Sequence, residues 1–103
     1  MNFEEKVWKL MKEIPKGKVT TYGLIAKKLN TKAYRAVGNA CLRNPYAPRV
    51  PCHRVVRSNG TIGGFGGKTS GQNIVNKIRM LQREGVEVRN GRIVDFERVV
   101  FRF

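Results

Sequence analysis

Apolar residues recur at helical spacing near the start of the chain. Asn2 and Glu5 match an N-terminal capping box, in which each side chain accepts from the other residue's backbone N–H. The apolar positions that follow predict an amphipathic helix over residues 3–14, which the Pro-Lys-Gly sequence at 15–17 ends. The predicted inner face consists of Phe3, Val7, Leu10, Met11 and Ile14.

Two more helices are predicted directly downstream. Residues 19–21 form a short extended segment, Thr21 caps a helix over 22–29, and Thr31 caps another over 32–43. The last of these has a face of small residues, namely Ala33, Ala36, Val37, Ala40 and Cys41. Two helices joined by a brief turn are typical of a helix-turn-helix, a shape that many small helical domains share.

The remaining pattern predicts one further helix and a small β element. A loop with three prolines precedes the segment Cys52–Val56, and a glycine-rich loop covers 63–67. A fourth helix over 73–84 is closed by Gly85, and residues 86–94 read as a hairpin with a type I′ turn at Asn-Gly. A terminal apolar strand over 99–103 is expected to pack back. The predicted fold is mainly α with a small β-hairpin, close to a winged helix-turn-helix.

The charge of the chain points to a polyanionic partner. Lys and Arg number 21 against 7 acidic residues, a formal net charge of +14. Scattered positive charge of this size favours a folded surface that binds nucleic acid; a solvated surface or an RNA-associated scaffold is the alternative. No apolar run approaches the roughly 18 residues of a membrane span, and two cysteines suit a reducing compartment. We expect a cytoplasmic protein, or a nuclear one in a eukaryote, with no membrane partner.

Cys52 and His53 are the first candidates for chemistry. A thiolate is a strong nucleophile, and a neighbouring base or cation can activate it. Neighbours in a strand point to opposite faces, so an inert buried cysteine beside a surface histidine is the alternative. Together with Cys41 these residues supply at most three metal ligands without the paired spacings of zinc sites, so no metal site is predicted. The glycine-rich loop could approach a phosphate or a flat base closely, but it lacks the P-loop pattern.

Taken together, these features resemble the O6-alkylguanine-DNA alkyltransferases. The sequence PCHRV at 51–55, preceded by Asn44-Pro45 and followed by the glycine-rich loop, is similar to the active-site signature of that family. The likeness continues over residues 3–88. It includes VTTYGLIAKKL at 19–29, YRAVG at 34–38 and LQREG at 81–85.

The resemblance implies five catalytic residues. Cys52 would accept the alkyl group from guanine O6, and His53 would act through a water as the base that generates the thiolate. Glu84 would hold the imidazole, and Asn44 would fix the turn around the cysteine by hydrogen bonds to backbone. Tyr22 would donate at N3 of the guanine as negative charge develops on the leaving base. Arg54 would bind a carbonyl or form an ion pair.

The resemblance also implies minor-groove binding and extrusion of the damaged base. Arg35 would fill the space that the base leaves, and the other DNA-binding candidates are Tyr34, Ala36, Gly38 and Ser58. The candidates for the base pocket are Tyr22, Val55, Ile62, Phe65, Gly66 and Cys41. The carbonyl of Val55 would accept from the exocyclic amine, and the amide of Gly66 would face O6. The implied partner is double-stranded DNA containing O6-alkylguanine, bound by a monomer without a cofactor.

Two functions follow from this resemblance. The first is DNA repair by one irreversible transfer of an alkyl group to Cys52. The second is the role of alkyltransferase-like proteins, which bind such lesions without repairing them. Residues 1–103 are expected to form one C-terminal-type domain without the family's N-terminal domain, as in those proteins. Those proteins usually lack the acceptor cysteine, whereas Cys52 is present, and Phe65 replaces a family tyrosine. A plain winged-helix regulator, the third alternative, would not explain Cys52, His53 and Glu84.

Overall fold

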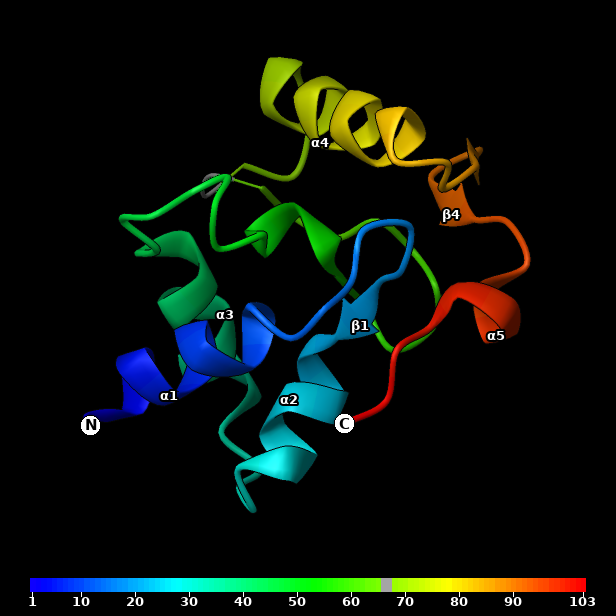
Figure 1. Cartoon of the computed structure of the whole chain (residues 1–103). Helices are drawn as coiled ribbons and strands as arrows, with labels where there is room; N and C mark the ends of the chain where they lie inside the picture. Colours follow the sequence, from blue (N-terminus) through cyan, green and yellow to red (C-terminus); the bar gives the residue numbers. More distant parts are fainter. Residues whose placement is uncertain (66–67) are drawn as a thin grey trace.

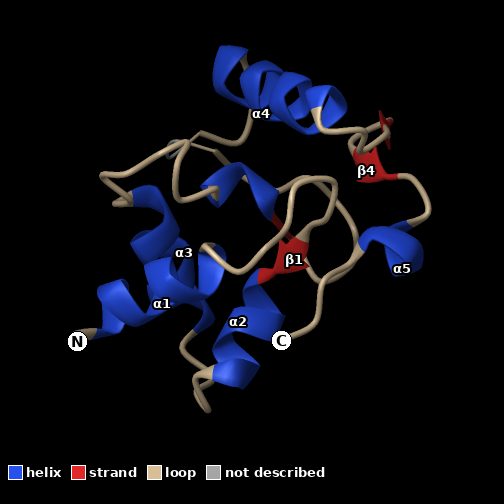
Figure 2. Cartoon of the chain, viewed as in Figure 1, coloured by secondary structure: helices blue, strands red, loops and turns tan. Residues whose placement is uncertain are grey.

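The computed structural model describes residues 1–65 and 68–103 of the chain (Figure 1). In chain order, its elements are α1 (Phe3–Met11), β1 (Thr20–Thr21), α2 (Tyr22–Lys28), α3 (Tyr34–Leu42), the 3₁₀ turn η1 (Cys52–Arg54), β2 (Val55–Val56), α4 (Gln72–Arg83), β3 (Val88–Arg89), β4 (Arg92–Ile93) and α5 (Phe96–Val99). Helices dominate and the strands are short (Figure 2), which confirms the predicted mainly α fold with a small β-hairpin.

The first helix begins as predicted and ends earlier. The side chain of Asn2 accepts from the Glu5 backbone N–H at 2.9 Å, and the Asn2 N–H donates to the Glu5 carboxylate at 3.1 Å, so the capping box is present. Helix α1 ends at Met11 instead of residue 14 because the following residues form tighter turns, with Ile14 N bonded to Met11 O. Ile14 still packs in the core at 1% exposure.

The two helices of the predicted helix-turn-helix are both present. The hydroxyl of Thr21 accepts from Leu24 N at 3.0 Å and caps α2, as predicted. Helix α3 begins two residues later than expected because Thr31 does not cap it. The Thr31 hydroxyl accepts from Ala33 N in a local turn, and Ala33 occupies the N-cap without a side-chain bond.

A parallel pairing that the sequence pattern did not predict connects the two halves of the chain. Thr20 pairs with Val55 and Thr21 with Val56, so β1 lies beside β2. The strand predicted over 99–103 is not formed: Val99 ends the short helix α5, which follows the left-handed Asp95, and residues 101–103 have no regular structure. The segment does pack back, as expected, because Phe101 and Phe103 lie against the core. Only Val100 forms a bridge, to Val19, in that segment.

The end of α4 and the hairpin agree closely with the prediction. Helix α4 ends at Arg83, and Glu84 is its C-cap. Val88 pairs antiparallel with Ile93, and Asn90 and Gly91 both have positive φ, as a type I′ turn requires.

Two apolar clusters form the core, and the segment around η1 runs between them. Figure 1 shows α1, α2 and α3 together at one end of the molecule and α4 at the other, with β1 between them. The first cluster contains Val7, Met11, Ile25, Val37 and Val55, and the second contains Val19, Val56, Ile62, Leu81 and Val86. In the described part of the chain, no helix has the length and apolar character needed to cross a membrane.

Candidate active site

Cys52 lies at the start of η1, and the preceding loop holds it there. The side-chain amide of Asn44 donates to Val50 O at 2.7 Å, and its carbonyl oxygen accepts from Tyr46 N at 2.9 Å. The Cys52 N–H donates to the same Val50 carbonyl at 2.9 Å. Asn44 therefore fixes the backbone immediately before the cysteine from both ends of the loop.

His53 and Arg54 both contact Glu84, at the end of α4. Nε2 of His53 lies 2.9 Å from Glu84 Oε2. Arg54 donates to both carboxylate oxygens, at 2.8 and 2.7 Å, and to the Ile14 carbonyl at 2.8 Å. Burial favours a higher pKa for Glu84, but hydrogen bonds from Arg54 and His53 outweigh it and lower that pKa. Glu84 is thus a carboxylate that orients the imidazole.

The imidazole of His53 is buried and neutral. Its residue is 2% exposed, and burial lowers its pKa below the ordinary value of 6.5 despite the carboxylate of Glu84. When Nε2 donates its proton to Glu84, Nδ1 carries a free lone pair. Nδ1 is buried and has no hydrogen-bond partner among the described residues. This nitrogen is therefore available as a base.

The thiol of Cys52 is protonated at rest. Burial raises its pKa, while a hydrogen bond involving Asn44 and the positive charge of Lys77 lower it, and the net shift is upward. Such a thiol needs a base before it can act as a nucleophile. His53, the next residue in the chain, is the candidate for that base.

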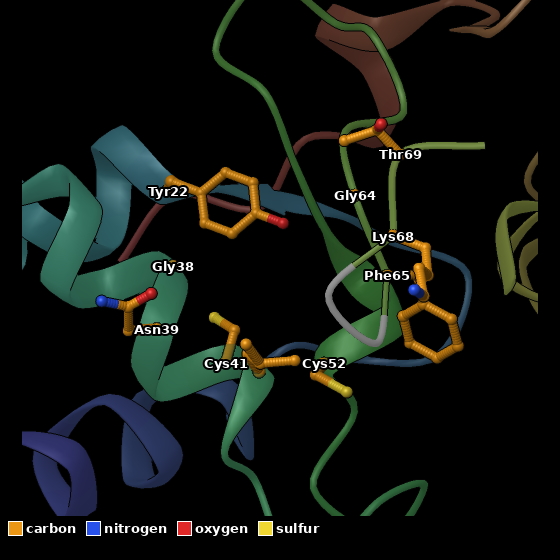
Figure 3. Close-up of a pocket in the computed structure, with 10 residues that line it drawn as sticks. Tyr22, Gly38, Asn39, Cys41, Cys52, Gly64, Phe65, Lys68 and Thr69 are labelled. Carbon is orange, nitrogen blue, oxygen red and sulfur yellow. The ribbon is translucent and has the colours of Figure 1, made fainter.

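Cys52 opens into a pocket of about 330 Å³, at the small end of the roughly 300–1,000 Å³ typical of ligand sites. Figure 3 shows Tyr22 from α2, Cys41 from α3 and Cys52 around this pocket. Its lining residues are Tyr22, Gly38, Asn39, Cys41, Leu42, Cys52, Gly64, Phe65, Lys68 and Thr69. Burial raises the pKa of Tyr22 far above its ordinary value, so its hydroxyl is a hydrogen-bond donor at neutral pH.

Three other pocket candidates lie elsewhere or outside the description. The side chain of Ile62 belongs to the second core cluster and does not line the pocket, because it packs with Val56 and Leu81. Val55 is fully buried in the first cluster, and its carbonyl accepts from Lys77 Nζ at 2.8 Å. Gly66 lies outside the described residues.

The DNA-binding candidates divide between two places. Tyr34, Arg35, Ala36 and Gly38 occupy the first half of α3, where Tyr34 and Arg35 are exposed. Ser58 lies instead beside the start of α2, where a Cβ added to Gly23 would approach its hydroxyl to 2.7 Å. The exposed part of α3 adjoins the pocket through Gly38.

Sequence reasoning missed Lys77, which is fully buried in α4. A lysine on a helix ordinarily faces solvent, and no lysine of this helix was singled out from the sequence. The available signal was spacing. Lys77 follows Ile74 by three positions and precedes Leu81 by four, which puts it on the apolar stripe. Asn39, Leu42, Lys68 and Thr69 of the pocket lining were missed as well, and no pattern singles them out.

Curated relatives share the sequence around this site. A methylated-DNA–protein-cysteine methyltransferase of Methanosarcina mazei is 56% identical over 64 residues, covering 61% of this chain and 40% of that protein. One from Thermococcus kodakarensis is 49% identical over 86 residues, covering 82% of this chain and 45% of that protein. The chain thus spans less than half the length of these relatives.

Solved structures share the fold. The Mycobacterium tuberculosis protein OGT in complex with DNA matches with a TM-score of 0.73 and 40% identity, over 82% of this chain and 50% of that one. An S. pombe ATL structure in complex with DNA matches with a TM-score of 0.81 and 32% identity, over 98% of this chain and 95% of that one. A second S. pombe structure, in complex with damaged DNA containing O6-carboxymethylguanine, has a TM-score of 0.83 and 31% identity, over 98% of this chain and 95% of that one.

The family assignment rests on most of the chain. Residues 2–86 match the family described as 6-O-methylguanine DNA methyltransferase, DNA binding domain. That range contains α1 to α4, the loop held by Asn44, and the Cys52, His53 and Glu84 set. The chain therefore belongs to the family of the 6-O-methylguanine DNA methyltransferase DNA-binding domain.

Proposed function

We propose that this protein repairs DNA by transferring an alkyl group from guanine O6 to Cys52, once per molecule. The observation that carries the proposal is the contact between His53 and Glu84, 2.9 Å apart, beside an intact cysteine that lines a pocket. A lesion-binding protein needs the pocket but has no use for a nucleophile and an oriented base.

The reaction begins with removal of the thiol proton. Nδ1 of His53 takes the Cys52 proton through a water, while Glu84 holds the proton on Nε2 and stabilises the imidazolium that forms. The thiolate attacks the alkyl carbon, the S–C bond forms and the C–O6 bond breaks. The electron pair of that bond passes to the guanine, where Tyr22 donates a hydrogen bond at N3 and the base takes up a proton from solvent. A thioether is not hydrolysed, so the cysteine is consumed.

Binding to DNA would use the exposed start of α3. Arg35 is exposed there, and Ala36 and Gly38 are small enough for the helix to lie close to a sugar-phosphate backbone. A net charge of +14 supports binding to a polyanion. Because Cys52 lines a pocket, the target base would leave the duplex to reach it, and Arg35 would occupy its place.

The second candidate function is lesion binding without transfer. It is supported by the likeness to the S. pombe ATL structure in complex with DNA, which matches 98% of this chain with a TM-score of 0.81 and 32% identity. The presence of Cys52 argues for transfer, because binding alone leaves the nucleophile and its base without a purpose.

Intact mass after incubation with a duplex containing O6-methylguanine tests the choice. A gain of one methylene, mapped by peptide digestion to Cys52 and absent in Cys52→Ala, supports repair. Cys52→Ala should still bind the lesion duplex, which separates loss of chemistry from loss of the fold. An unchanged wild-type mass with selective binding to the lesion would make the protein a damage sensor.

A further inference from the structure

Lys77 is a buried cation with an unusual set of partners. It is 0% exposed, and Nζ donates to the carbonyls of Val55 at 2.8 Å, Ile62 at 2.6 Å and Gly64 at 3.1 Å. Among the described residues, no carboxylate forms a salt bridge with it. Burying an ammonium group is costly unless it is fully hydrogen-bonded, and here all three N–H donors have partners.

The three carbonyls belong to opposite sides of the active site. Val55 begins β2, directly after the turn that carries Cys52. Ile62 and Gly64 lie on the segment that approaches the pocket from the other side, where Gly64 and Phe65 are lining residues (Figure 3). A single ammonium group therefore connects the turn that contains Cys52 to the opposite wall of the pocket.

The positive charge of the same ammonium group acts on both pocket thiols, Cys41 and Cys52. Burial lowers the pKa of Lys77 to about 8, and the thiols of Cys41 and Cys52 act against that shift, so it is mostly charged at neutral pH. Its charge in turn lowers the pKa of Cys52 against the effect of burial. The other titratable groups around these residues are Tyr22, Arg57, His53, Arg54 and Glu84. Of these, His53 is neutral, and the charge of Glu84 is compensated by its ion pair with Arg54.

We propose that Lys77 is a positioning residue for Cys52. Lys77 joins the turn that contains Cys52 to the opposite wall of the pocket and places a positive charge within electrostatic reach of the cysteine sulfur. The part that concerns alkyl transfer rests on the proposed function; the part that concerns the thiol does not. A residue that served packing alone would need neither three carbonyl partners nor a charge, since methionine fills a similar volume.

The test compares Lys77→Met, Lys77→Gln and Lys77→Arg with Arg79→Gln, which removes one exposed charge from the same helix. The measurement is the rate at which iodoacetamide modifies Cys52 as a function of pH, quantified by peptide mapping so that Cys41 does not contribute. Thermal unfolding and binding to duplex DNA establish that each variant is folded. If Lys77→Met fails to fold, the glutamine and arginine variants decide, because both keep hydrogen-bond donors and differ in charge.

We expect the midpoint of the Cys52 pH profile to rise in Lys77→Gln and Lys77→Met, with modification about tenfold slower at neutral pH, the change that one pKa unit corresponds to. The rates should converge at high pH, and Lys77→Arg and Arg79→Gln should resemble wild type. An unchanged midpoint in folded Lys77→Gln and Lys77→Met would overturn the inference. If wild type transfers no methyl group while the midpoint shifts, the proposed function is wrong and the role of Lys77 toward the thiol stands.

Discussion

Replacement of Glu84 by glutamine tests the central geometry of the site. Glutamine has the same shape as glutamate but keeps one acceptor oxygen and gains an NH₂ group. Arg54 donates at 2.8 and 2.7 Å to the carboxylate, so we expect it to retain the remaining oxygen. The NH₂ group then faces Nε2 of His53, which must become an acceptor, and the proton moves to Nδ1. In Glu84→Gln the free lone pair is therefore on the wrong nitrogen.

The magnitude follows from the contacts that are lost. The carboxylate accepts three short hydrogen bonds from His53 and Arg54, and its side chain is only 13% exposed. Charge-assisted bonds contribute about 1.5–3 kcal/mol each and glutamine replaces part of them, so the free energy of unfolding should fall by about 2–3 kcal/mol. Loss of a general base typically costs about 10²–10⁴ in rate, and we expect transfer to slow by about 10²–10³-fold.

The assay is single-turnover methyl transfer from a duplex containing O6-methylguanine, followed by intact mass, beside chemical unfolding of the same preparations. Glu87→Gln is the matched control, because Glu87 is an exposed glutamate whose ion pair with Arg89 lies on the surface. It should change neither quantity appreciably. Glu84→Gln that transfers at the wild-type rate, with the expected loss of stability, would refute the assignment of His53 as the base.

Four further predictions rest on other parts of the molecule. Arg35→Ala should slow transfer from duplex DNA and have less effect on free O6-benzylguanine; equal slowing on both substrates would remove the role in base extrusion. Tyr22→Phe should reduce the transfer rate by about tenfold, the effect of one lost hydrogen bond, without weakening DNA binding measured by anisotropy. Thr21→Ala removes the cap of α2 and should lower the free energy of unfolding by about 1 kcal/mol in a denaturant titration. The folded pKa of Lys77, about 8, lies below its ordinary value of 10.5, so the unfolded chain binds more protons between these values. Relative to Lys77→Met, wild-type stability should therefore rise with pH above about 8, by about 1 kcal/mol per pH unit, and parallel stability curves would contradict this.

The stability of the site against acid follows the same linkage rule. The pKa of His53 is lowered in the folded protein, so unfolding takes up a proton as pH falls below about 6.5, and stability is lost there. The pKa of Glu84 is also lowered, and its contribution is lost as pH falls below about 4.5. Both groups therefore act in the same direction on the acid side.

Local signals made much of the fold predictable. The capping box of Asn2 and Glu5, the Thr21 cap and the Asn90-Gly91 turn each depend on residues within a few positions, and each is present. The pairing of Thr20 with Val55 was not predictable, because strands of two residues have no periodicity and the partners are far apart in sequence. The left-handed Asp95, which precedes the unpredicted helix α5, likewise has no reliable sequence pattern.

The site was predictable in a different way. Spacing and composition allowed two interpretations of Cys52 and His53, a nucleophile with its base or an inert pair. The family resemblance pointed to Glu84, 31 positions beyond His53. Neither the sequence pattern nor the family resemblance pointed to Lys77. Its burial depends on the backbone carbonyls of Val55, Ile62 and Gly64. Every residue has a backbone carbonyl, so the residue types at these positions do not indicate that they bind a lysine.

A cysteine that can react only once benefits from being unreactive at rest. Burial keeps the thiol of Cys52 protonated, which protects it from soluble electrophiles, and burial also keeps His53 neutral and able to accept a proton. Asn44 and Lys77 oppose the effect of burial on the pKa of Cys52, which makes removal of the thiol proton by His53 less costly. A substrate base that fills the pocket would lower the local dielectric, in which the charge of Lys77 and the hydrogen bond from Asn44 act more strongly on the thiolate. Under the proposed function, the opposing shifts at Cys52 would keep the acceptor unreactive until a guanine carrying an alkyl group occupies the pocket.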